Sequence, residues 1–298
     1  MRRAVLVLAL VGALAGAAGL WVTRAEGLAA GDIAALAALD GDAARGEEVF
    51  WAAGCASCHA APEAAGDDRM ILTGGRAFPS DFGTFVAPNV SMHPESGIGD
   101  WTLAEFADAV QRGVSPSGAH YYPAFPYTAY ALAAPQEVVD LWAFWQGLPA
   151  ADVASRPHDL AFPFSIRRGV GAWKLLHAGR GHATPGADDA SVARGRHLAE
   201  ALAHCGECHT PRDATGGLDR SRWLQGAPDP GGKGRVPGLA PDQLDWSAGE
   251  IAAYLNDGFT PDYDSAGGHM VSVIRNLARL PEADRVAIAA YLKALPDG

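Results

Sequence analysis

Cys55-Ala-Ser-Cys58-His59 is repeated 150 residues later as Cys205-Gly-Glu-Cys208-His209, and the two copies use all four cysteines of the chain. Two thiols at this spacing reach both vinyl groups of one porphyrin, and the histidine that follows places its imidazole on the iron. The pattern therefore predicts two covalently attached c-type haems. The residues predicted to hold them are Cys55, Cys58 and the proximal ligand His59 for the first haem, and Cys205, Cys208 and the proximal ligand His209 for the second.

A pair of cysteines at this spacing has three other common interpretations: a zinc site, a dithiol redox switch and a structural disulfide. A four-cysteine zinc site brings its two pairs within about 15–20 residues of one another, whereas well over a hundred residues separate the pairs here. The other two interpretations do not require a histidine directly after the second cysteine, and this chain has one in both places. We therefore interpret both motifs as haem-attachment sites.

Residues 1–25 form a segment of their own. Arg2 and Arg3 precede an uncharged run of 19 residues from Ala4 to Val22. This run exceeds the apolar core of about 7–15 residues in a signal peptide and approaches the roughly 20 residues that cross a bilayer. A cleaved signal peptide is the alternative, although Val22-Thr-Arg-Ala25 is a poor cleavage site. We favour an uncleaved anchor with its basic end inside the cell, which places the rest of the chain on the periplasmic side of a bacterial inner membrane.

The chain of 298 residues has a formal net charge of −11 and is long enough for two small domains. An acidic surface repels nucleic acid and, where it has a function, steers a basic patch on a redox partner. Nothing resembles a nucleotide-binding loop or a catalytic serine arrangement, and no catalytic residue is predicted. The expected partners are therefore redox proteins and, through residues 1–25, the membrane, with no nucleic acid.

The two haem motifs stand in two copies of one plan. Asp100-Trp-Thr102 aligns with Asp245-Trp-Ser247 at an offset of 145, and the register continues without gaps to Pro116 and Pro261. In both copies a hydroxyl residue stands three positions before a glutamate, which is a capping box that starts a helix. We therefore expect an all-α protein with domains at 40–150 and 189–298, joined by a linker at 151–188.

The order of elements in each copy resembles the class I cytochromes c, in which a glycine on the first helix meets an aromatic residue on the last. Gly46 with Phe144, and Gly195 with Tyr291, are the matching positions. The resemblance implies two tandem class I cytochrome c domains, each carrying one covalent haem.

A narrower resemblance covers about residues 40 to 298 and is specific in its first half. Gly74-Gly-Arg76, Pro88-Asn-Val90 and His120-Tyr-Tyr-Pro-Ala-Phe-Pro-Tyr127 are similar to stretches in the cytochrome subunits of membrane-bound bacterial alcohol and gluconate dehydrogenases. Those subunits usually carry three haem domains, whereas this chain has two. In many of them methionine stands where this chain has Phe125.

The sixth iron ligands differ between the two copies. In the second, Met270 lies 62 residues after Cys208, and a thioether there would give His/Met iron with a raised potential suited to electron transfer; the neighbouring His269 is its competitor. The first copy has no methionine in the corresponding loop. If the loops differ by a few residues, His120 falls near the position of Met270 and the first haem is bis-histidine. Met92 is the alternative, and an open sixth position is a third.

Two classes of function remain. The first is an electron carrier of the periplasm, which takes electrons from a dehydrogenase or quinol-linked donor and passes them to a downstream cytochrome or oxidase of a respiratory chain. The second is a dihaem redox enzyme, either a peroxidase or a sulfur-compound oxidoreductase, with catalysis at the first haem. Such an enzyme needs acid-base groups over the open face of that haem, and the sequence offers no identifiable set. We therefore favour the carrier, or an electron-transfer subunit of an oxidoreductase.

Overall fold

The computed structural model describes residues 2–229 and 234–297. Met1, at the start of the predicted anchor, and residues 230–233 and Gly298, in the second predicted domain, lie outside the described residues. The α-helices are α1 (Arg2–Val22), α2 (Ala30–Ala37), α3 (Ala43–Ala52), α4 (Cys55–His59), α5 (Leu103–Ala107), α6 (Tyr127–Tyr130), α7 (Pro135–Trp145), α8 (Gly169–His177), α9 (Ala190–His197), α10 (Gly206–His209), α11 (Ala248–Asp257), α12 (Met270–Leu277) and α13 (Glu282–Lys293). Short 3-10 turns are η1 (Gly66–Met70) and η4 (Arg220–Arg222), and π-helical turns are η2 (Asp108–Arg112) and η3 (Leu198–Leu202). The strands are β1 (Ala77–Ser80), β2 (Gly83–Val86), β3 (Asp159–Leu160), β4 (Ala227–Pro228) and β5 (Arg235–Val236).

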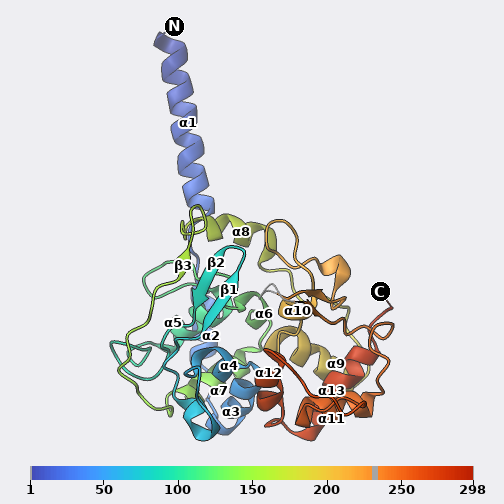
Figure 1. Cartoon of the computed structure of the whole chain (residues 1–298). Helices are drawn as coiled ribbons and strands as arrows, with labels where there is room; N and C mark the ends of the chain where they lie inside the picture. The colour runs from blue at the N-terminus through green and yellow to red at the C-terminus, as the bar shows by residue number, and fades with distance from the viewer. Residues whose placement is uncertain (1, 230–233, 298) are drawn as a thin grey trace.

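Helix α1 projects from the globular part of the molecule (Figure 1). Its 21 residues have a mean hydropathy of 2.4 over the most apolar window, and none of that window is buried. At 1.5 Å per residue such a helix is about 30 Å long, which matches the hydrocarbon thickness of a bilayer. By length and composition this helix is able to cross a membrane.

One pair of crossing helices forms the core of each half of the globular part. In the first half α3 packs against α7, and in the second α9 packs against α13. A Cβ atom at Gly46 would lie 2.0 Å from the carbonyl oxygen of Asp140 and 2.8 Å from Cβ of Phe144. At Gly195 the carbonyl oxygen of Ala287 would lie 1.8 Å away. Only glycine lets the helix axes approach this closely, and the contacts predicted between the first and last helix of each copy are confirmed.

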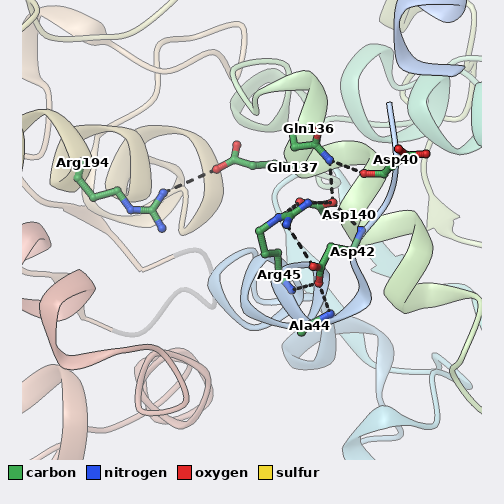
Figure 2. Close-up of polar contacts among 8 residues, drawn as sticks. All are labelled: Asp40, Asp42, Ala44, Arg45, Gln136, Glu137, Asp140 and Arg194. Carbon is green, nitrogen blue, oxygen red and sulfur yellow. Dashed lines mark hydrogen bonds and ion pairs between the residues drawn. The ribbon is translucent and has the colours of Figure 1, made fainter. Parts of the chain in front are cut away.

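A charged network ties the start of α3 to α7 (Figure 2). The Arg45 guanidinium donates to both carboxylate oxygens of Asp140, at 2.7 and 3.0 Å. Asp42 caps α3 by accepting from the amides of Ala44 and Arg45, and its own amide donates to Asp140 at 2.8 Å. Burial by itself would raise the pKa of Asp140, but the hydrogen bonds from Arg45, the Asp42 amide and Gln136 lower it below its usual value. The ionised carboxylate therefore fixes the angle at which α3 leaves the preceding loop.

The two halves pack against each other in a reciprocal way. Helix α12 of the second half lies against α3 and α4 of the first, while α6 of the first half lies against η3 of the second. Glu137 at the start of α7 contacts His197 of α9 at 2.9 Å and Arg194 at 3.7 Å, the latter drawn in Figure 2. The haem motifs of the two halves consequently lie on the two sides of one shared interface.

Two small sheets interrupt the helical architecture that the sequence predicted. β1 and β2 form an antiparallel hairpin with Ala77 opposite Val86, and β3 pairs with the other edge of β2; β4 and β5 form a separate two-stranded pair. Gly83 has a φ of 118° and passes so close to β3 that a Cβ would lie 2.4 Å from the carbonyl oxygen of Asp159, which glycine alone permits. The predicted linker at 151–188 thus supplies the third strand of this sheet and helix α8.

Candidate haem sites

Each haem motif forms a short helix that begins after a sharp change in backbone direction. The motif at 55–59 is α4 and the motif at 205–209 ends in α10. The residue before each first cysteine has left-handed backbone, with φ of 69° at Gly54 and 41° at His204. The two cysteines of each motif are therefore one helical turn apart, which presents both thiols on the same side of the helix.

The two proximal histidines have the same hydrogen bond. Nδ1 of His59 lies 3.0 Å from the carbonyl oxygen of Pro88, and Nδ1 of His209 lies 2.8 Å from that of Pro237. A carbonyl can only accept, so Nδ1 carries the proton and Nε2 keeps its lone pair. Burial lowers the pKa of both imidazoles, which keeps them neutral. A neutral imidazole oriented through Nδ1 by a carbonyl is the form that binds iron, so these residues fit the predicted role.

No disulfide joins the four cysteines, which are partly buried at Cys55, Cys58 and Cys205 and exposed at Cys208. Burial raises the pKa of Cys55 to about 12, of Cys58 to about 11 and of Cys205 to about 12. Neutral thiols in an apolar setting fit the attachment of a hydrophobic porphyrin.

The loops that precede the last helix of each half have identical hydrogen bonds at an offset of 145 residues. The amides of Ser115 and Thr260 donate to the carbonyls four residues ahead, and the amides of Tyr121 and Ala266 donate back to Gly113 and Gly258. The isolated bridge from Val114 to His120 matches that from Phe259 to Ser265. No difference in loop length exists up to residue 121, so the equivalent of His120 is Ser265.

The same register corrects the alignment on which His120 was predicted as a sixth ligand. At the same offset of 145 residues, the residue of the first half that corresponds in sequence to Met270 is Phe125. His120 is buried, and its Nε2 lies 3.0 Å from the carbonyl oxygen of Thr23 at the end of α1. Among the contacts of the described residues, none joins His120 to Cys55, Cys58 or His59. The structure thus brings His120 to the base of α1 and not to the first haem motif.

Met92 and Met270 lie in different parts of their halves. Met92 follows Pro88 by four residues on the segment that holds His59, and this segment is fixed by Trp145, whose Nε1 donates to the carbonyl of Val90 at 2.9 Å. A sixth ligand approaches iron from the face opposite the proximal histidine. Met92 lies on the segment that holds His59, so its position does not favour a role as sixth ligand. Met270 starts α12 and packs against the core, and the ring of its neighbour His269 stacks on Phe78 of β1 at 6.1 Å.

Contacts between the two motifs were not predictable from the sequence. Asn276 of α12 is almost fully buried; its Nδ2 donates to Oγ of Ser57, inside the first motif, at 2.9 Å, and its Oδ1 accepts from Arg69. The residues that make these bonds are separated by more than 200 positions, and no local pattern marks them. The helix that begins at Met270 is therefore bonded directly to the first haem motif.

A second contact joins the motifs on the other side of the interface. The ring of Tyr130 meets that of His204 edge to face at 5.5 Å, and its hydroxyl donates to the carbonyl oxygen of Ala53 at 2.6 Å. The ring of His204 is thus half-buried between the two halves.

Comparison with known proteins shows the family of this chain. The sequence profile of the cytochrome c family matches residues 192–296. A dihaem c-type cytochrome of Cereibacter sphaeroides is 56% identical over 95% of this chain and 95% of its own length. The fructose dehydrogenase cytochrome subunit of Gluconobacter japonicus is 36% identical over 85% of this chain, which spans 52% of that subunit. The cytochrome c subunit of the quinone-dependent alcohol dehydrogenase of Gluconobacter oxydans is 31% identical over 92% of this chain and 60% of that subunit.

The resemblance to dehydrogenase cytochrome subunits that the sequence suggested is thereby confirmed, and so is the prediction of two haems. Similarity along nearly the full length of a dihaem relative accounts for both motifs at once. The chain belongs to the cytochrome c family and, as a dihaem c-type cytochrome, carries two c-type haems.

Proposed function

We propose that this chain is a dihaem electron carrier of the periplasm, built from two tandem class I cytochrome c domains at 40–150 and 189–298 with the segment 151–188 between them. Thioether bonds from Cys55 and Cys58, and from Cys205 and Cys208, hold the haems. His59 and His209 are the proximal ligands, and Met270 is the sixth ligand of the second haem. When bound, the haem irons supply reversible one-electron exchange.

The contribution of the protein is to hold the two sites in a fixed relation. The observation that carries the proposal is the bond from Asn276, on the helix that Met270 begins, to Ser57 between the first pair of cysteines. Because Asn276 is almost fully buried and also accepts from Arg69, this bond is not a surface contact that opens freely. The two motifs that would hold the haems are therefore fixed relative to one another, as exchange of electrons between the haems would require.

We further propose that helix α1 is an uncleaved anchor in the inner membrane, with the haem domains on the periplasmic side. Its apolar length and the arginines at its start support this orientation. Several relatives are named as cytochrome subunits of fructose, gluconate and alcohol dehydrogenases, which supports a dehydrogenase or a quinol as electron donor here. A downstream cytochrome or oxidase is the acceptor, and the net negative charge of the chain suits an acceptor with a basic docking face.

A second candidate, a dihaem redox enzyme with catalysis at the first haem, is favoured by one observation. Phe125 stands at the position equivalent to Met270, and a phenyl ring offers no ligand to iron. Against this candidate, the sequence offers no identifiable set of acid-base groups for the first haem, and the ring contacts of Phe125 are with Tyr121, Tyr127 and Tyr130.

Stopped-flow spectroscopy of the purified holoprotein separates the two candidates. The fully reduced protein is mixed either with an oxidised soluble cytochrome c or with hydrogen peroxide. The carrier is expected to deliver both electrons to the cytochrome and to react slowly and without turnover with peroxide. Catalytic consumption of peroxide, with poor reduction of the cytochrome, would reverse the assignment.

A further inference from the structure

A cluster of exposed apolar side chains lies outside α1, in the segment 151–188. Phe162, Phe164, Ile166, Leu175 and Leu176 are 81%, 43%, 52%, 59% and 55% exposed. We call these five residues the foot patch. In the described chain beyond α1, four other large apolar side chains are this exposed: Val153 at the start of the same segment, and Phe259, Tyr263 and Val286 in the second half. Single exposed apolar residues are ordinary, whereas a cluster of them marks an interaction surface.

The foot patch is held at the base of α1. The guanidinium of Arg168 donates to Oγ1 of Thr23 at 3.3 Å and to the carbonyl oxygen of Leu20. Gly171 of α8 lies so close to Thr23 that a Cβ would be 2.2 Å from the carbonyl oxygen of Thr23. Figure 1 shows α8 beside the point where α1 leaves the globular part. Any bilayer that α1 crosses therefore begins next to this segment.

The loop that carries the phenylalanines is also fixed in place. The ring of Phe164 meets that of Phe82 edge to face at 4.9 Å, and its carbonyl oxygen accepts from the hydroxyl of Tyr122 at 2.9 Å. Phe162 projects from this anchored loop and remains the most exposed member of the foot patch. Apolar side chains on an ordered loop lose little conformational entropy when they enter another phase.

Charge distinguishes this segment from the rest of the chain. Residues 156–182 contain five arginine or lysine residues and one acid, whereas the whole chain has a net charge of −11. A surface of anionic lipid headgroups attracts such a segment and repels the acidic remainder. Lys174 also bonds to the carbonyl oxygens of Arg112 and Gly113, so that part of this positive charge is attached rigidly to the first half.

We propose that the foot patch and the basic side chains around it dock onto the surface of an anionic lipid bilayer, as a second membrane contact beside α1. Phe162, Leu175 and Leu176 enter the interfacial region, and the exposed side chains of Arg168 and Arg180 face the headgroups. Two contacts instead of one prevent the globular part from swinging on a single helix, and they hold the haem motifs in one orientation relative to the membrane. The proposal builds on the anchor suggested under the proposed function, but it concerns different residues.

Photo-crosslinking to lipid tests the proposal on the full-length holoprotein. The protein is reconstituted into phosphatidylcholine vesicles, with or without phosphatidylglycerol, that contain a lipid with a diazirine near the start of its acyl chain. Crosslinked peptides are then identified by mass spectrometry. We expect crosslinks in α1 and in residues 160–177, and several-fold more of the latter when phosphatidylglycerol is present.

Two variants give the comparison its control. The triple variant Phe162→Ser, Leu175→Ser, Leu176→Ser is expected to lose most crosslinks at 160–177 and to keep those in α1. The double variant Phe259→Ser, Val286→Ser removes exposed apolar side chains from the second half and is expected to change neither. Since all five positions are exposed, the Soret spectrum and far-UV circular dichroism should remain those of the wild type.

The outcomes separate this inference from the proposed anchor. Crosslinks confined to α1 would overturn the membrane contact of the foot patch and leave a protein partner as its occupant. Crosslinks at 160–177 without any in α1 would support the contact and contradict the anchor. Equal crosslinking of the triple variant and the wild type at 160–177 would also refute the assignment to these side chains.

Discussion

Replacement of Gly195 by alanine is expected to push apart the two helices on which the second half is built. The added Cβ would lie 1.8 Å from the carbonyl oxygen of Ala287 and 2.9 Å from Cβ of Tyr291. Since non-bonded atoms rest about 3.5 Å apart, α9 and α13 have to separate by roughly 1.5 Å. Tyr291 resists this movement, because its hydroxyl donates to the buried carboxylate of Glu200 at 2.8 Å and accepts from Trp223 at 2.9 Å.

The size of the effect follows from two opposing terms. Overpacking a dense core costs about 1–3 kcal/mol, and a clash with backbone belongs at the upper end because backbone atoms cannot change rotamer. Alanine recovers about 1 kcal/mol through its higher helix propensity. We therefore expect Gly195→Ala to lower the free energy of unfolding by about 2 kcal/mol.

Urea unfolding of the holoprotein, followed by far-UV circular dichroism, measures this loss. Gly249→Ala is the matched control, since Gly249 lies in α11 and an added Cβ there meets only Oγ of Ser247, at 3.9 Å. This variant is expected to be as stable as the wild type or slightly more so. If Gly195→Ala remained within about 0.5 kcal/mol of the wild type, the close helix crossing would not be a structural requirement and our reasoning would fail.

Four further predictions concern the iron ligands and the charged network. Met270→Ala should remove a thioether from the second haem and lower its reduction potential, as measured by redox titration; an unchanged potential would exclude Met270 as a ligand. Phe125→Met should create a thioether-to-iron charge-transfer band at the first haem, as measured by absorption spectroscopy. His120→Ala should leave the spin state of that haem unchanged in electron paramagnetic resonance. A change of spin state in His120→Ala would restore the bis-histidine hypothesis. The pKa of Asp140 is lower in the folded protein than in the unfolded chain, where it is about 4. The ionised carboxylate therefore stabilises the fold at pH values above about 4, and this contribution is lost as the pH falls through the folded pKa. The free energy of unfolding of Asp140→Asn should therefore depend less steeply on pH below about pH 4 than that of the wild type, and parallel curves would contradict this assignment.

The sequence predicted those features that depend on local chemistry. The haem motifs, the capping boxes at Thr102 and Ser247, and the glycines at the helix crossings each depend on residues that are close in the chain or that recur at a fixed offset. Both capping boxes are formed as predicted. The apolar run that forms α1 was evident for the same reason, because a helix satisfies its own backbone whatever surrounds it.

The alignment of the loop before Met270 with its counterpart in the first half could not be predicted from the sequence. The sequence allowed a few residues of difference between the two loops, and with that freedom His120 became a candidate ligand. The hydrogen bonds from Tyr121 to Gly113 and from Ala266 to Gly258 remove the freedom up to these residues and place His120 opposite Ser265. The register of a loop is set by which backbone amides and carbonyls form hydrogen bonds, and the residue types alone do not predict these pairs.

The relation between the two halves was decided by tertiary structure alone. Asn276 bonds to Ser57, Tyr130 meets His204, and Thr23 contacts both His120 and α8, all across long separations in sequence. The repeat specified two similar units, but either unit could be satisfied by its own core and its own haem. Their mutual placement depends on shape complementarity and on buried polar groups finding partners in the other half, and these conditions exist only when the whole chain has folded.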